Sequence, residues 1–178
     1  MRTAMNALVV EDLTKRFGNF TAVDHINFTV AQGESFGFLG PNGAGKTTTV
    51  RMITGLIKPD AGRASIMGHD VEKDGLNAKQ VTGVLPETSN AYIDLSAWQN
   101  LMLMGKLYGL EKTVRQDRAE DLLKRFDLYE KREVAVNGFF KGMKQRLQIC
   151  MALISEPQVL LWLCRERFSI DFGLGSPC

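Results

Sequence analysis

The chain has 178 residues, enough for one domain of ordinary size with its own hydrophobic core. A composition of 44% hydrophobic and 24% charged residues excludes intrinsic disorder and a coiled coil as the dominant state. Because 22 basic residues stand against 20 acidic ones, the net charge is only +2 and gives no indication of nucleic acid as a partner.

The cysteines and the apolar runs bear on the cellular compartment. Cys150, Cys164 and Cys178 are too few and too scattered for a disulfide framework or a zinc site, which favours a reducing compartment. Glu11 and Asp12 directly follow the short apolar run at the N-terminus, so no signal peptide is indicated. Every apolar run is shorter than the roughly 18 residues that a membrane span needs. We therefore expect a cytoplasmic protein that reaches a membrane only through a partner.

The first half of the chain is predicted to form strands around one glycine-rich loop. Alternating or continuous apolar residues predict strands at residues 7–13, 21–30, 35–39, 64–67 and 81–85. The strand at 35–39 runs directly into the glycine-rich segment, after which apolar residues at helical spacing predict a helix over residues 49–56. The order of strand, glycine loop and helix marks this segment as a candidate site.

The second half is predicted to be mainly helical. Ser96 can cap a first helix, and two more are expected over residues 113–126 and 142–154. The apolar residues 159–163 predict a buried strand that returns the chain to the sheet. The sequence therefore predicts an α/β domain with a helical insertion.

The glycine-rich loop fits the pattern G-x-x-x-x-G-K-[ST] without a gap. Gly43 and Gly45 let backbone N–H groups close around phosphate oxygens, where a Cβ would obstruct the approach. Lys46 would reach the β- and γ-phosphates and Thr47 would offer its hydroxyl to Mg²⁺, while the helix dipole favours the same negative charge. We predict that Mg²⁺ and ATP bind here, at Gly40, Pro41, Asn42, Gly43, Ala44, Gly45, Lys46, Thr47 and Thr48.

Three spaced motifs resemble the nucleotide-binding subunit of ATP-binding cassette (ABC) transporters, in the branch that pairs with export-type permeases. Besides the loop, they are residues 14–18 (TKRFG), 83–87 (GVLPE) and 141–147 (KGMKQRL), and the resemblance spans Leu8 to about Leu163. It implies a P-loop ATPase core with an N-terminal antiparallel β-subdomain, a helical insertion subdomain at about 92–155, and an incomplete C-terminus. Residues 1–163 would form this domain.

The resemblance also assigns roles to residues outside the loop. Phe17 matches an aromatic residue that stacks on adenine, the alternative being a side chain that fills the small β-subdomain. Glu87 stands where the family contacts Mg²⁺ and the attacking water, the alternative being an ordinary loop glutamate. Lys46 and Glu87 are thus the candidate catalytic residues, and Thr47 and Glu87 the candidate metal ligands.

The motif at residues 141–147 resembles the family signature. It implies that Lys141, Gly142 and Met143 contact the γ-phosphate held by a second nucleotide-binding subunit in a head-to-tail dimer. Phe140 occupies the position of the signature serine, so a hydroxyl donor is missing there. The basic residues of this motif are interpreted as a solvated helix face, not as a nucleic-acid site.

The end of the sequence departs from the family pattern. After residues 159–163 the family has Asp-Glu-Pro, whose carboxylates hold Mg²⁺ and polarise the attacking water, whereas this chain has Cys164-Arg165-Glu166. A thiol is a poor ligand for Mg²⁺ and an arginine cannot act as a base at neutral pH, so we expect impaired hydrolysis. We hypothesise that residues 164–178 are an aberrant or frame-shifted end on a truncated ATPase subunit.

Two functions follow from the resemblance. The first is the ATP-binding and ATP-hydrolysing subunit that powers transport through a separate transmembrane permease, at the inner face of the membrane. The second is a module that binds ATP and a partner without turnover. In both, the helical block 96–126 is the candidate permease-docking surface, by resemblance only.

Overall fold

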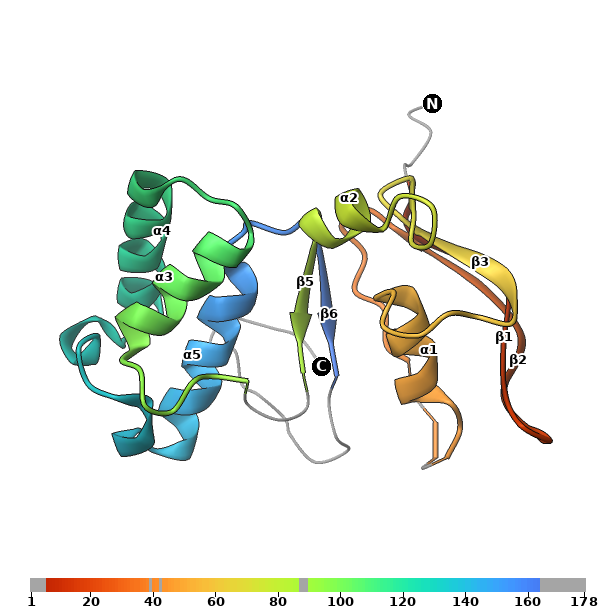
Figure 1. Ribbon diagram of the computed structural model, residues 1–178, viewed down its shortest axis with the longest axis horizontal. Helices are drawn as coiled ribbons and strands as arrows, with labels where there is room; N and C mark the ends of the chain where they lie inside the picture. Colours follow the sequence, from red (N-terminus) through yellow and green to blue (C-terminus); the bar gives the residue numbers. More distant parts are fainter. Residues whose placement is uncertain (1–5, 39, 42, 87–89, 164–178) are drawn as a thin grey trace.

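The computed structural model describes residues 6–38, 40–41, 43–86 and 90–163. Figure 1 shows three parts along the long axis: a helical group, a central pair of strands, and a second group of strands with further helices beside it. The elements are β1 (Asn6–Phe17), β2 (Phe20–Ala31), α1 (Lys46–Ile53), β3 (Ala61–Ile66), β4 (His69–Asp70), α2 (Gly75–Gln80), β5 (Thr82–Leu85), α3 (Ala97–Leu107), α4 (Lys112–Arg125), the 3₁₀ turns Tyr129–Lys131 and Val136–Gly138, α5 (Lys141–Leu153) and β6 (Val159–Trp162).

The N-terminal sheet is antiparallel, with strand order β2-β1-β3-β4. Alternating apolar residues of β1 and β3 face a core that also receives Met52 and Ile53 of α1. Between β1 and β2 the chain turns over Gly18 and Asn19, and the positive φ of Gly18 (58°) suits such a tight turn. The strands predicted at 7–13, 21–30 and 64–67 are therefore present in this sheet, each longer than the sequence indicated.

β5 and β6 form a separate, two-stranded parallel sheet. The prediction that residues 159–163 form a strand that returns the chain to the β-rich first part is confirmed for residues 159–162, which pair with the strand predicted at 81–85. β6 is less buried than predicted, since Leu160 and Trp162 are exposed. The physical reason is that a strand is fully buried only where other elements cover both of its faces, and the face of β6 that carries Leu160 and Trp162 is more exposed than the face that carries Val159 and Leu161.

The strand predicted at 35–39 is not formed over residues 35–38, and Leu39 lies outside the described residues. A strand needs a neighbour to accept and donate its backbone hydrogen bonds. Within the described residues no such ladder includes this segment. Its aromatic rings instead pack on β2, where Phe36 stacks on Phe28 at 5.2 Å between ring centroids and Phe38 lies at 5.7 Å.

The helices α3, α4 and α5 enclose their own apolar core, which runs from Ala91 to Ile154 in sequence. As predicted, Ser96 caps α3: its hydroxyl accepts from Gln99 N at 3.2 Å while the Gln99 side chain accepts from Ser96 N, a capping box. Cys150 is buried in this core, and burial raises the pKa of its thiol to about 12. The thiol is therefore protonated, and a weak nucleophile, at neutral pH.

Helix boundaries differ from the prediction at α1. The helix begins at Lys46, not at Thr49, and ends at Ile53 because Gly55 adopts a positive φ of 67°. The Leu56 and Gly55 N–H groups donate to the carbonyls of Arg51 and Met52, which closes the helix end. Leu56 thus lies beyond the helix and is exposed.

The mixed architecture, an antiparallel N-terminal sheet followed by a parallel pair with helices, confirms the predicted fold class. The short helix α2 was not anticipated from the sequence. Among the described residues, each helix is too short or too polar to cross a lipid bilayer.

Candidate phosphate-binding site

The glycine-rich loop closes over the start of α1 through its own backbone. Ala44 N donates to Pro41 O at 3.1 Å, and Thr49 N donates to Gly45 O at 2.8 Å. Gly43 and Gly45 have φ of 87° and 80°, a region that side-chain-bearing residues rarely adopt. The loop therefore turns toward the N-terminus of α1, where helix N–H groups and the helix dipole favour an anion.

Gly45 is also where the loop touches the N-terminal sheet. A Cβ built on it would lie 2.4 Å from Ala22 O and 3.0 Å from Val23 Cγ2 of β2. No side chain fits such a gap, so glycine is required by space as well as by φ. This contact places the phosphate loop directly against the sheet face that carries Val23.

Lys46 folds back over the loop. Its ammonium donates to Gly40 O, and to Pro41 O at 2.9 Å. These two carbonyls hold the Lys46 ammonium beside the start of the loop, where a cation can also meet phosphate oxygens that bind at the helix N-terminus. The structure therefore brings together the predicted lysine and the predicted loop.

The two threonines that follow Lys46 lie in the first turn of α1. Thr47 is exposed and Thr48 is half-buried, so the Thr47 hydroxyl is accessible to a ligand. Within the described residues no group of three or more His, Cys, Asp or Glu side chains could hold a metal. Mg²⁺ commonly takes few protein ligands and completes its shell with phosphate and water, so one hydroxyl beside a triphosphate fits it.

Phe17 lies at the tip of the β1–β2 hairpin and is 53% exposed. The interpretation that it fills the small β-subdomain is therefore wrong. Lys15 Nζ sits 5.7 Å from the centroid of its ring and is itself held by Asp60 Oδ1 at 3.0 Å and by Lys58 O at 2.7 Å. The ring is thus presented to solvent on an anchored strand end, as a base-stacking side chain requires.

The residues that resemble the family signature do not lie beside the phosphate loop. Lys141, Gly142 and Met143 begin α5 in the helical group, and Figure 1 shows β5 and β6 between that group and α1. The structure therefore does not bring them to the phosphate loop of the same chain. The Met143 side chain is buried in the helical core, so only its backbone could contact a ligand, and Phe140, 77% exposed, offers no capping side chain.

Several predicted residues lie outside the described residues: Asn42, Glu87, and the whole of 164–178 with Cys164 and Arg165. Pro86, the residue before Glu87 in the sequence, is nevertheless held by a hydrogen bond. Gln148 of α5 is buried, and its Nε2 donates to Pro86 O at 2.6 Å. The sequence analysis missed Gln148, although a polar residue inside the apolar stripe of a helix was a usable signal.

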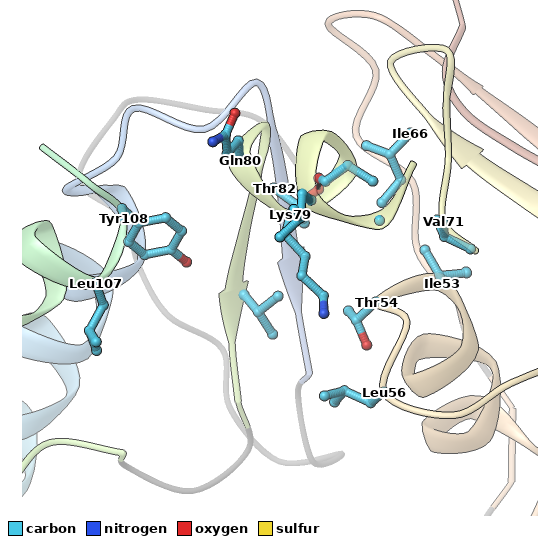
Figure 2. Close-up of a pocket in the computed structure, with 14 residues that line it drawn as sticks. Ile53, Thr54, Leu56, Ile66, Val71, Lys79, Gln80, Thr82, Leu107 and Tyr108 are labelled. Carbon is cyan, nitrogen blue, oxygen red and sulfur yellow. Dashed lines mark hydrogen bonds between the residues drawn. The ribbon is translucent and has the colours of Figure 1, made fainter. Parts of the chain in front are cut away.

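A second feature is a cleft of about 470 Å³ between the two main parts. Figure 2 shows it bounded by the end of α1, by α2 and β5, and on the far side by Leu107 and Tyr108 at the end of α3. Its lining is mainly apolar, and Lys79, which extends into it beside Thr54, is its one charged lining residue. Leu56 and Leu107 are both exposed here. Such a surface is typical of a binding site for an apolar partner.

Residues 23–162 match the protein family described as ABC transporter. The linearmycin resistance ATP-binding protein LnrL of Bacillus subtilis (strain 168) is 40% identical over 154 residues, which cover 86% of this chain and 50% of that protein. The chain spans about half the length of the curated relatives it matches.

Solved structures agree with this assignment. One titled as the ATP binding subunit of an ABC transporter superimposes with a TM-score of 0.79 at 31% identity, covering 88% of this chain and 65% of the other. The cbiO1 structure from Clostridium perfringens, described as part of the ABC transporter complex cbiONQ, has a TM-score of 0.78 at 24% identity, covering 88% and 64%, and supports the fold.

Proposed function

The chain belongs to the ABC transporter family, and from this premise we propose that it is an ATP-binding subunit that powers transport through a separate permease. The observation that supports this most directly is the closed glycine loop at the start of α1 with the Lys46 ammonium held beside the start of the loop. A cation surrounded by backbone groups at a helix N-terminus is suited to a polyphosphate.

The proposed site assigns a task to each part of the loop. Backbone N–H groups of residues 43–48 surround the phosphates, and Lys46 neutralises charge on the β- and γ-phosphates. The Thr47 hydroxyl would hold Mg²⁺, which when bound neutralises the charge that develops as the γ-phosphoryl group is transferred. Phe17 would stack on the adenine base, so that base and phosphates are held by different parts of the molecule.

Whether the bound ATP is hydrolysed depends on carboxylates that follow β6 in the family. Here the residues at that point of the sequence are Cys164 and Arg165. This observation favours the second candidate function, ATP binding without turnover. An ATPase measurement with saturating Mg²⁺-ATP separates the two: turnover above that of a Lys46→Ala variant would support the enzyme, and equal rates would support the non-hydrolysing module.

Lys46→Ala tests the site itself. We expect Mg²⁺-ATP affinity to fall at least about tenfold, because charge-assisted hydrogen bonds to phosphate are lost. Isothermal titration calorimetry on the purified chain measures the change. Lys58→Ala is the matched control, since Lys58 is an exposed lysine that forms an ion pair with Glu72 at 3.5 Å. Unchanged ATP affinity in Lys46→Ala would contradict the assignment.

Two protein partners belong to the proposal. Members of this family work with transmembrane permeases, and we assign permease docking to the cleft between Leu56 and Leu107, to which the helical block 96–126 contributes Leu107 and Tyr108. The remote position of residues 141–143 supports a head-to-tail dimer, in which the start of α5 would meet the nucleotide of a second subunit.

A further inference from the structure

We propose that Phe20 is a second base-binding residue and that Phe17 and Phe20 together form a two-ring surface for a purine. The inference rests on the proposed function, because it concerns the base of the same nucleotide. It adds a residue to which neither the sequence motifs nor the comparisons give a role.

The two phenylalanines face the same way. They are directly paired across the hairpin, Phe17 on β1 opposite Phe20 on β2. Side chains of directly paired residues in an antiparallel sheet project from the same face, with Cβ atoms about 5 Å apart. The two side chains therefore start from neighbouring positions on one face, and 53% of Phe17 and 63% of Phe20 are exposed.

That face is the one against which the phosphate loop lies. Lys15 is two residues before Phe17 on β1, so it shares the face, and Lys15 is paired with Val23. Val23 Cγ2 is the atom that a Cβ on Gly45 would approach to 3.0 Å. The aromatic pair and the phosphate loop thus lie on one side of the sheet.

The spacing also fits a nucleotide. Phe20 and Val23 of β2 lie opposite Phe17 and Lys15, which are two residues apart on β1, and a strand advances about 3.3 Å per residue, so Phe20 lies on the order of 7 Å along the sheet from the loop contact. The ribose and phosphates of one nucleotide can span such a separation. Figure 1 shows the hairpin tip and the start of α1 at the same end of the molecule.

The chemistry of the tip selects a flat apolar ligand. Two large rings exposed beside Lys15 and Arg16 would otherwise leave apolar surface in water. A purine has the larger π-face of the two base classes and can cover more of a two-ring surface than a pyrimidine. We therefore expect purine nucleoside triphosphates to bind more tightly than pyrimidine ones.

The test compares four variants by calorimetry on the full chain with Mg²⁺-ATP. Phe20→Ala should weaken binding about fivefold to tenfold, within the usual range for loss of one base-stacking ring. Phe20→Leu should lose most of the same affinity, whereas Phe20→Trp should keep it, which separates stacking from bulk. Leu76→Ala, an exposed apolar residue on α2, is the control and should bind as the unsubstituted chain does.

Inorganic tripolyphosphate is the second probe, because it has no base. Its affinity should be the same for Phe20→Ala and the unsubstituted chain, and the preference for ATP over CTP should shrink in the variant. ATP affinity unchanged in Phe20→Ala would overturn the inference, as would equal weakening of ATP and tripolyphosphate, which would indicate a structural role. Failure of the proposed function can be told apart from failure of this inference, because it would appear as unchanged ATP affinity in Lys46→Ala.

Discussion

Gly45 combines three local requirements in one residue. It precedes the first residue of α1, its φ is 80°, and the backbone of β2 leaves no room for a side chain. Gly43 has nearly the same φ, 87°, but a Cβ built on it would meet no atom within 4 Å. A side chain at Gly43 would therefore meet only an unfavourable backbone conformation, whereas a side chain at Gly45 would meet the same conformation and a steric clash with β2.

Gly45→Ala should destabilise the chain more than Gly43→Ala. Each substitution places an L-residue in the left-handed region at a cost of about 1–2 kcal/mol. At Gly45 the displacement of β2 adds about 1–3 kcal/mol. The free energy of unfolding from urea titration measures both. Equal losses in the two variants would show that the loop does not press on β2 as described.

At the scale of elements, the β1–β2 hairpin is held by the loop that precedes β3. Asp60 Oδ2 accepts from Arg16 N at 2.6 Å, Asp60 Oδ1 accepts from Lys15 Nζ at 3.0 Å, and Asp60 N donates to Thr14 O at 2.9 Å. The Arg16 N–H group, and then Lys15, lower the pKa of the Asp60 carboxyl below its usual 3.8. One exposed carboxylate thus joins the strand end that presents Phe17 to the rest of the sheet.

Asp60→Asn should therefore lower stability at pH 7, but not in strong acid. Because the folded-state pKa lies below the unfolded value, the stabilisation is complete above about pH 3.8 and is lost as the pH falls through the folded-state pKa. Urea unfolding of both proteins between pH 7 and pH 2 measures the difference, with Asp94→Asn as an exposed control. A gap between the two proteins that widens in acid would be inconsistent with this account.

The described residues form two large apolar cores with a cleft between them, and a small third cluster of Leu85, Ile149 and Ala152 joins β5 to α5. One core lies between α1 and the antiparallel sheet, and the other lies among α3, α4 and α5. A hydrogen bond between Gln148 and Pro86 and an ion pair between Arg118 and Glu156 join α5 and α4 to neighbouring segments. The cleft of Figure 2 has one wall from each part, so a ligand there would contact both.

Charge placed in the cleft should therefore weaken permease binding. We expect Leu56→Asp and Leu107→Asp each to reduce co-purification at least about tenfold with a permease that binds the unsubstituted protein, because an apolar contact would be replaced by a buried charge. ATP affinity, measured in parallel, should not change. Val114→Asp on α4, which does not line the cleft, is the control. Undiminished co-purification of both cleft variants would reject this docking surface.

Predictions from local sequence were the accurate ones. The Ser96 cap and the helix predicted at 142–154 depend on residues within a few positions of one another, and the structure confirms both, the helix as Lys141–Leu153. The glycine loop before a helix was recognised from consecutive residues in the same way. Such features follow from backbone preferences and side chains that meet along one segment.

What the amino-acid order decided, then, was the identity of the elements and of the phosphate loop. The tertiary structure decided which residues that are not adjacent in the chain come into contact: β6 pairs with β5, Phe36 packs on Phe28, and Gly45 contacts β2. The physical reason is that strand pairing and close approach depend on which backbone is nearby in space, which periodicity does not encode.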